Sequence, residues 1–139
     1  MNTDEDVYRD LTLDESWDMI SGMSFGRLAF AVAGVPEIVP INYCVSERKL
    51  YFRTSEGSKL AGLTINHNVA FEIDTYEEDS AASVILSGTA RELQAPDELA
   101  WADTLPLRPW VPTLKYHFVE ITPDVVTGRL YRLGPEPER

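Results

Sequence analysis

Most of this chain alternates between apolar and polar residues with a period of two, which is the pattern of half-buried β-strands. The alternation begins with GRLAFAVA at Gly26 and continues through EIVPINYCV, KLYFRT, VAFEIDTY, SVILSGTAREL, KYHFVEIT and VVTGRLYRL. Turn residues separate these runs, at Gly34 and Val35, at SERK and at EEDS. Six or seven short strands joined by tight turns predict a mainly antiparallel barrel with helices packed on its outside or ends.

Three short segments carry helix signals instead. Leu11 to Gly22 has Thr12 as N-cap and Glu15 as its capping-box partner, with apolar residues at helical spacing behind them. Residues 96–104 open with Pro96, which suits the first turn of a helix. A third short helix is expected between Gly57 and Asn68. The 139 residues then divide into an acidic tail (1–10), a single domain (11–133) and a polar C-terminal tail (134–139).

The charge balance limits the partners of this domain. The formal net charge of -11 would be repelled by nucleic-acid phosphates and by anionic membranes, so we expect neither as a partner. The acidic N-terminus does not match a signal peptide, and the single Cys44 suits a reducing compartment, so we expect a cytoplasmic protein. Residues 25–69 hold five basic and three acidic residues, which makes them the first place to look for an anion site.

The stretch YFRTSEGSKL, residues 51–60, has the composition of a phosphate site. Arg53 and Thr54 end a predicted strand, and Ser58 and Lys59 open a predicted helix after a glycine-containing loop. Helix N-termini offer unpaired N–H donors and a partial positive charge, while arginine adds a planar fork suited to phosphate oxygens. A solvated turn with a serine N-cap explains the same residues, and the spacing alone does not separate the two readings.

The stretch VPINY, residues 39–43, places a proline inside an apolar strand. Alternation puts Pro40 and Asn42 on one face and Val39, Ile41 and Tyr43 on the other. Proline has no N–H for a ladder, so it belongs at a sheet edge or beside something other than a strand. A flat heteroaromatic ligand could use this edge, and protection of an edge strand against aggregation is the alternative.

Other candidate motifs favour structural roles. GMSFG at 22–26 lies between a helix and a strand, the reverse of a hydrolase elbow, and SERK lies in a hairpin turn. His67 and His117 are far apart and have no ligand-type neighbour at helical spacing, so each is interpreted as a satisfied or exposed histidine. Cys44 lies in an apolar strand and is interpreted as a small buried hydrophobe.

Taken in order, GRLAF, VPINY, YFRTSEGSKL, VAFEID, SVILSGTARE and LRPWVP resemble the pyridoxamine 5'-phosphate oxidase-like family of FMN-binding split barrels. The likeness runs from about Leu11 to Arg129. It implies a mainly β fold, a six-stranded antiparallel split barrel of Greek-key type with a few short helices. It also implies a homodimer with FMN bound between the two chains.

The same resemblance implies a set of cofactor-binding residues. Arg53, Ser58 and Lys59 would hold the FMN phosphate, with Thr54 and Leu60 alongside. The isoalloxazine would be lined by Val39, Pro40, Ile41 and Asn42. Trp110 of LRPWVP would close the site from the partner subunit, unless it is an ordinary core aromatic. One departure is Ala81 and Ala82, where related sequences often carry Gly-Trp, which puts the packing around the ring in doubt.

Three functions follow from this resemblance. The first is an FMN-dependent oxidoreductase that exchanges hydride with a small, unidentified substrate without an obligatory acid or base from the protein. The second is a reductase of the same fold that uses a deazaflavin. The third is a flavin- or haem-binding carrier or sensor without turnover, although two histidines in the whole chain argue against haem. No metal site or catalytic residue is expected.

Overall fold

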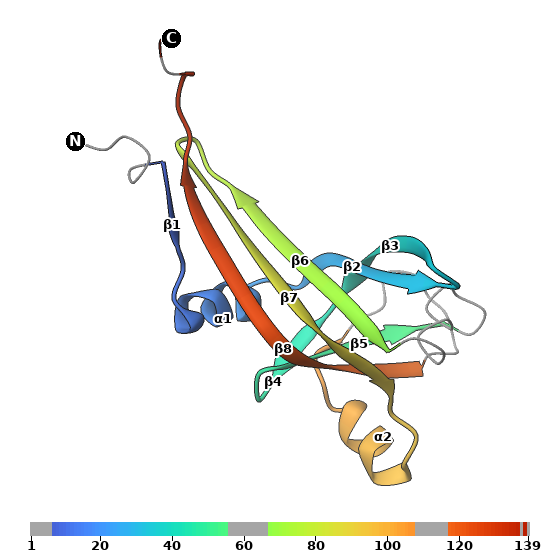
Figure 1. Cartoon of the computed structure of the whole chain (residues 1–139). Coiled ribbons are helices and arrows are strands. Elements are labelled where there is room, and N and C mark those ends of the chain that lie inside the picture. The colour runs from blue at the N-terminus through green and yellow to red at the C-terminus, as the bar shows by residue number, and fades with distance from the viewer. Residues whose placement is uncertain (1–6, 56–66, 108–116, 137, 139) are drawn as a thin grey trace.

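The fold of this protein is taken from a computed structural model, which describes residues 7–55, 67–107, 117–136 and 138. Its elements are β1 (Tyr8–Asp10), α1 (Leu13–Ser21), β2 (Phe25–Val32), β3 (Val35–Asn42), β4 (Cys44–Ser46), β5 (Lys49–Thr54), β6 (Asn68–Tyr76), β7 (Ser80–Glu92), α2 (Pro96–Ala102) and β8 (His117–Arg132). The strands form one antiparallel sheet in the order β3-β2-β6-β7-β8-β5-β4, and β1 pairs with β8 (Figure 1). The predicted mainly β, antiparallel class is confirmed.

The sheet has eight strands in the described residues rather than six. Tyr43 separates β3 from β4, so one predicted run becomes two strands. The last two predicted runs join into one strand, β8. This strand has a β-bulge at Asp124, because Val125 pairs with Ser87 and Pro123 pairs with the next residue, Gly88. Residues 8–10, which the sequence assigned to the tail, form β1 on the edge of β8. These differences arise from pairing between distant segments, which local patterns do not encode.

Two tight hairpins set the register of the first strands. Val32 pairs with Val35, so the first turn is Ala33 and Gly34, one residue earlier than predicted. Both turn residues have positive φ, 51° and 80°, as a two-residue hairpin loop of the primed type requires. The second turn lies at Glu47 and Arg48, inside SERK as expected, and also has positive φ at both residues.

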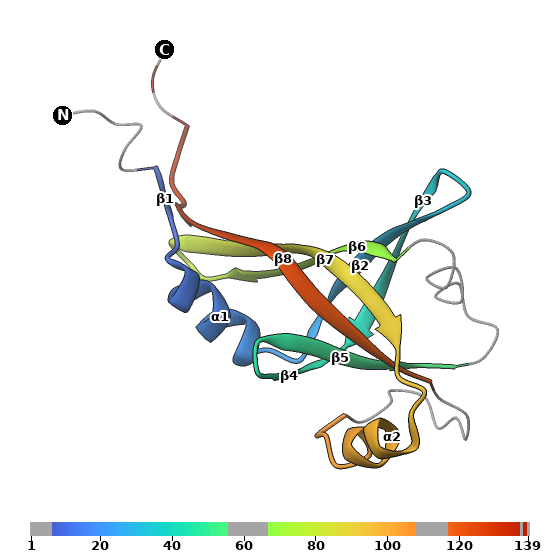
Figure 2. The ribbon, with the colours of Figure 1, turned by 60° about the horizontal axis from the view of Figure 1, so that its bottom comes forward.

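The chain crosses from one edge of the sheet to the other at Tyr43. β3 forms one edge, β4 forms the opposite edge, and only Tyr43 lies between them. The sheet must therefore curl until β3 approaches β5, and residues of these two strands come within contact distance without a hydrogen-bonded ladder being described between them. We call this meeting of β3 and β5 the seam. The result is the split barrel that the sequence predicted (Figure 2).

Tyr43 is fixed at this crossing by three contacts. Its hydroxyl donates a buried hydrogen bond of 2.6 Å to the Ile20 carbonyl, and its backbone N–H donates to the Ser24 carbonyl at 3.0 Å. Its ring meets the edge of Phe71, with the ring centroids 4.8 Å apart. Burial raises the pKa of the Tyr43 phenol well above its usual value, so it stays a donor.

Helix α1 covers one end of the barrel as predicted. Thr12 is its N-cap, and Thr12 and Glu15 form the expected capping box. The Arg9 guanidinium, followed by the Thr12 N–H, lowers the pKa of Glu15 to about 2. Trp17 and Ile20 then enter the main apolar core between the curled strands.

Helix α2 packs on the opposite face of β5 and β8, outside the barrel (Figure 2). Alternation along β5 sends Leu50 and Phe52 into the barrel core and Tyr51 into the second apolar cluster under α2. Trp101 of α2 meets the Tyr51 ring edge-on, with centroids 5.0 Å apart. No helix of the described residues is long and apolar enough to cross a membrane.

A polar network ties α2 to the sheet. Glu120 of β8 is 7% exposed and accepts hydrogen bonds from the Tyr51 hydroxyl at 2.9 Å and from Arg91 Nε at 3.1 Å. The other end of the Arg91 guanidinium forms a forked pair with Glu98 of α2, at 3.3 and 2.7 Å. Lys49 lies 4.0 Å from Glu120. Arg91 therefore compensates the charge of the buried Glu120 carboxylate and also links β7 to α2.

We predict that Tyr43→Phe lowers the free energy of unfolding by about 1–3 kcal/mol, because the buried Ile20 carbonyl loses its hydrogen-bond donor. Urea denaturation followed by circular dichroism measures this change. Tyr76→Phe is the matched control, since Tyr76 is 77% exposed and should lose almost nothing. Equal stability of the two variants would contradict the anchoring role of Tyr43.

We predict that Arg91→Met costs about 2 kcal/mol or more, because Glu120 then remains buried without its cation. Arg48→Met is the control: Arg48 pairs with Asp14 at 2.7 Å, but both side chains are more than half exposed, so its loss should cost well under about 1 kcal/mol. The same denaturation series compares the two. A cost for Arg91→Met as small as that for Arg48→Met would show that Glu120 does not need the pair.

Candidate functional site

Six of the ten predicted cofactor-binding residues fall in the described part of the chain. Val39, Pro40, Ile41 and Asn42 form the end of β3, and Arg53 and Thr54 form the end of β5. The remaining four lie outside the described residues: Ser58, Lys59, Leu60 and Trp110. The third expected helix lies there as well.

The β3 segment has the two faces that its sequence predicts. Ile41 is 7% exposed and belongs to the barrel core, and Val39 packs against that core. Pro40 is exposed and Asn42 is half-buried on the outer face. In the described sheet β3 has a single neighbour, β2, where Pro40 pairs with Arg27. The missing N–H of Pro40 is therefore tolerated because β3 is an edge strand, which confirms that interpretation.

The seam brings β3 and the end of β5 together. The β4–β5 ladder pairs Cys44 with Tyr51. The chain then continues through Tyr43 into β3, and residues of β3 and β5 come within contact distance. The strands that carry the two segments singled out by the sequence are therefore in contact at the seam.

Arg53 and Thr54 point to opposite faces because they alternate along β5. Arg53 shares the face of Tyr51, and its guanidinium carbon lies 4.9 Å from the centre of the Phe118 ring. Thr54 shares the face of Phe52 and pairs with His117 across β8. Alternation thus places Arg53 on the outer face of β5 and Asn42 on the outer face of β3.

The sequence missed a polar cluster beside Thr54. His117 Nδ1 lies 2.6 Å from Glu92 Oε1, and Gln94 donates a hydrogen bond of 3.2 Å to Glu92 Oε2. The interpretation of His117 as a satisfied histidine is confirmed, but its partner lies on β7, 25 positions earlier in the chain. Only the strand pairing could reveal it.

GMSFG and Cys44 lie in structural positions of the fold. GMSFG runs from the end of α1 into β2, so it cannot form a strand-turn-helix elbow. Cys44 is half-buried, and burial raises the pKa of its thiol to about 11, which makes it a poor nucleophile. In the described part of the chain, no three His, Cys, Asp or Glu side chains gather as a potential metal site.

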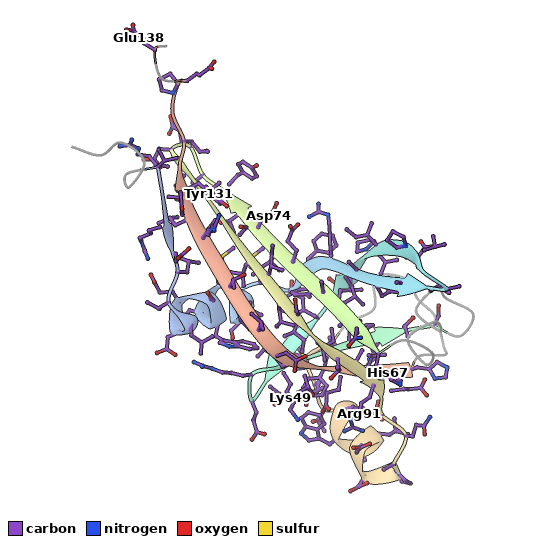
Figure 3. The ribbon with its side chains drawn as sticks, viewed as in Figure 1. Lys49, His67, Asp74, Arg91, Tyr131 and Glu138 are labelled. Atoms are coloured by element: carbon purple, nitrogen blue, oxygen red, sulfur yellow. The ribbon has the colours of Figure 1, made fainter. Side chains whose placement is uncertain are left out.

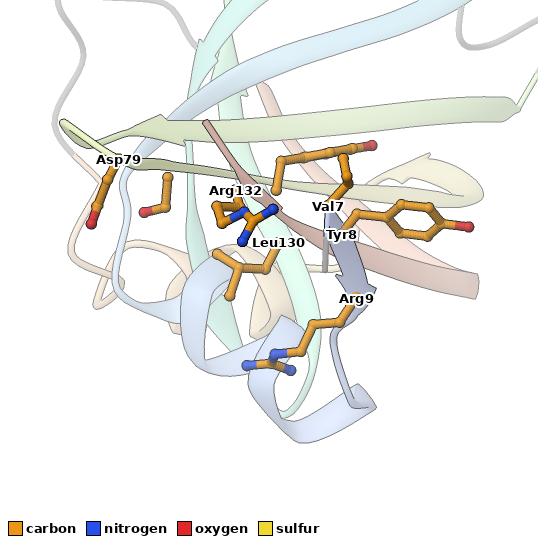
Figure 4. A pocket seen from close by; sticks show the side chains of 8 residues that line it. Val7, Tyr8, Arg9, Asp79, Leu130 and Arg132 are labelled. Atoms are coloured by element: carbon orange, nitrogen blue, oxygen red, sulfur yellow. The ribbon is translucent and has the colours of Figure 1, made fainter. Parts of the chain in front are cut away.

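Two cavities open at the other end of β7 and β8. One, of about 390 Å³, is lined by Val7, Tyr8, Arg9, Asp79, Ser80, Leu130, Tyr131 and Arg132 (Figure 4). A second, of about 520 Å³, adjoins it along β8. From Phe118 to Tyr131 the strand runs about 40 Å, at roughly 3.3 Å per residue. The cavities are thus remote from Arg53 in the same chain.

Ala81 and Ala82 lie at that remote end. They pair with Tyr131 and Leu130 on β8, and with Tyr76 and Thr75 on β6. Within one chain, the replacement of the usual Gly-Trp pair therefore alters a region far from the seam.

Comparison with known proteins agrees with this architecture. The sequence matches the pyridoxamine 5'-phosphate oxidase family over residues 12–130. An uncharacterized protein of Mycobacterium tuberculosis is 40% identical over 95 residues, covering 68% of this chain and 86% of that protein.

Two solved structures are similar over almost their whole length. A candidate pyridoxamine 5'-phosphate oxidase from Corynebacterium glutamicum has a TM-score of 0.84 and 39% identity, covering 94% of this chain and 97% of that chain. A FAD binding protein from Mycobacterium smegmatis has a TM-score of 0.79 and 37% identity, covering 91% of this chain and 100% of that chain. The fold and the order of its elements are therefore shared with flavin-related proteins.

Proposed function

The chain belongs to the pyridoxamine 5'-phosphate oxidase family, and on that premise we propose that it is a flavin-dependent oxidoreductase whose cofactor lies at the seam. The observation that supports this proposal is the contact between β3 and β5, the strands that carry Asn42 and Arg53 on their outer faces. FMN is the cofactor that the sequence resemblance implies. FAD is a second candidate, because the Mycobacterium smegmatis relative binds it.

The described residues fit a flavin. The β3 edge presents an exposed proline and the Asn42 amide, which suit a flat ring that needs a few polar edge contacts. Arg53 supplies a planar guanidinium for phosphate oxygens. Lys59 and Ser58 are expected to bind the same phosphate. A bound flavin would supply the hydride-accepting chemistry, and these residues would bind and orient it.

The stacking of Arg53 on Phe118 supports a binding role. A guanidinium held over an aromatic ring loses less rotamer freedom when it meets a phosphate than a free side chain does. Phe118 itself is 3% exposed and fixed in the cluster under α2. The α2 network therefore supports the position of Arg53 indirectly.

A homodimer is part of the proposal, and the outer face of the sheet supports it. One row of cross-strand neighbours on this face is free of charge and runs through Ile38, Ala29, Ala70, Ser87 and Val125. Ile38 and Val125 at its two ends are 63% and 57% exposed. A surface row of small and apolar residues suits close packing against a second copy.

A flavin-binding protein without turnover is the second candidate function, favoured by the relative that is described only as a FAD binding protein. Anaerobic reduction by NADH or NADPH, followed by reoxidation with added electron acceptors, separates the two. Repeated turnover supports the oxidoreductase, and a bound flavin that neither coenzyme reduces and no acceptor cycles supports a carrier.

We predict that the purified protein, titrated with micromolar FMN or FAD, binds flavin with the absorption bands of a protein-bound ring. Arg53→Ala and Lys59→Ala should each weaken binding at least tenfold, because each removes a charge-assisted hydrogen bond to phosphate. Arg48→Ala is the control, since Arg48 pairs with Asp14 at the far hairpin. A wild-type protein that binds neither flavin would refute the proposal, and a deazaflavin would be titrated next.

We predict that Ala70→Arg, at the centre of the uncharged row, converts the dimer to a monomer by placing a charge in the interface. Light scattering after gel filtration measures the mass. Glu78→Arg, in the exposed turn between β6 and β7, is the control and should leave the mass unchanged. A monomeric wild-type protein, or a dimer that survives Ala70→Arg, would contradict this interface.

A further inference from the structure

The cavity of about 390 Å³ lies where β1, β7 and β8 meet, at the end of the sheet marked by Tyr131 and away from α2 (Figure 3). It has no part in the proposed flavin site. Its volume falls within the roughly 300–1,000 Å³ that small-molecule pockets occupy. A small molecule therefore fits there, and the side chains around the cavity indicate which kind.

The cavity opens on the face of the sheet that also carries α1. A Cβ added at Gly128 would meet α1 at 2.6 Å, so this face of β8 is turned toward the helix. Alternation places Leu130 and Arg132 on the same face (Figure 4). Arg9 of β1 pairs with Leu130, and the Val7 carbonyl accepts a hydrogen bond from the Arg132 N–H. The uncharged row proposed as the dimer interface lies on the opposite face of the sheet.

Two opposite charges line the cavity without pairing with each other. Arg132 supplies a guanidinium, and Asp79, in the turn between β6 and β7, supplies a carboxylate. Ser80 pairs with Arg132, and the Asp79 carbonyl accepts a hydrogen bond from the Leu133 N–H, so the two charged residues are diagonal neighbours. Among the described residues, neither of them forms an ion pair. Both charges are therefore available to a ligand.

The rest of the lining is apolar or already compensated. The Arg9 guanidinium donates to both carboxylate oxygens of Glu15 on α1, at 3.0 and 2.9 Å, so its charge is compensated within the chain. Val7 and Leu130 add aliphatic surface beside Arg132. The cavity thus combines one available cation, one available anion and an apolar wall.

We propose that this cavity binds a small zwitterion with an apolar side chain, of the chemical class of the aliphatic α-amino acids. The Arg132 guanidinium binds the ligand carboxylate, whose two oxygens suit its planar donors. The Asp79 carboxylate binds the ligand ammonium, and Val7 and Leu130 contact the side chain. A simple anion is repelled by Asp79 and a simple cation by Arg132, so only a ligand with both charges is favoured by both residues. The proposal does not depend on the flavin site.

The test titrates the ¹⁵N-labelled full chain with L-leucine and follows its backbone amides by NMR. We expect saturable shifts at Ser80, Leu130 and Arg132, with a dissociation constant of about 1 mM or lower. Isocaproate lacks the ammonium and isoamylamine lacks the carboxylate, so each should bind at least tenfold more weakly than leucine. Glycine keeps both charges but has no side chain to contact the apolar wall, so it should also bind more weakly.

Two variants separate the two charges. Asp79→Asn should weaken leucine binding at least tenfold and should not weaken isocaproate binding, because the repulsion of the anion is removed. Arg132→Met should weaken both ligands at least tenfold. Glu78→Gln, in the same turn but outside the lining, and Arg48→Met, at the far hairpin, are the matched controls and should change neither affinity. All four side chains are exposed, so the variants should fold.

Each outcome supports or overturns the site. Leucine shifts that map to the cavity, with the expected order of ligands and variants, support it. The absence of a saturable shift with leucine up to about 10 mM overturns it. It is also overturned if isocaproate or glycine binds as tightly as leucine, or if the leucine affinity survives either Asp79→Asn or Arg132→Met.

Discussion

The single-residue crossing at Tyr43 is the constraint on which this structure depends. β3 and β4 form opposite edges of one sheet, so the chain can connect them directly only if the sheet curls into a barrel. The hydrogen bond from the Tyr43 hydroxyl to Ile20 and the ring contact with Phe71 hold that crossing. The seam follows from it, because the chain on either side of Tyr43 must bring β3 against β5.

What the sequence predicted correctly was encoded locally. Thr12 and Glu15 are three residues apart and cap α1 by direct contact. Pro40 has no N–H to donate, so its strand, β3, lies at the edge of the sheet. What it missed depends on partners far along the chain. Glu92 meets His117 only because β7 and β8 pair in one register, and Glu120 is satisfied by side chains from two other strands. Periodicity identifies strands, but it does not identify their neighbours.

In the candidate site, too, the sequence predicted local features correctly but not the faces on which the side chains lie. The sequence singled out Val39 to Asn42 and Arg53 for their unusual chemistry, and the fold brings their strands, β3 and β5, into contact. It treated Arg53 and Thr54 as one cluster, whereas strand alternation turns them to opposite faces.

The excess of basic residues in segment 25–69 is largely compensated once the chain is folded. Of the basic residues in the middle third, Arg27 lies 3.8 Å from Asp74, Arg48 pairs with Asp14, and Lys49 approaches Glu120. Acidic residues from the rest of the chain therefore fold back onto most of this positive segment. The guanidinium carbon of Arg53 lies 4.9 Å from the centre of the Phe118 ring. The net charge of a sequence segment therefore does not give the local charge around its basic residues, because carboxylates from other segments fold beside them.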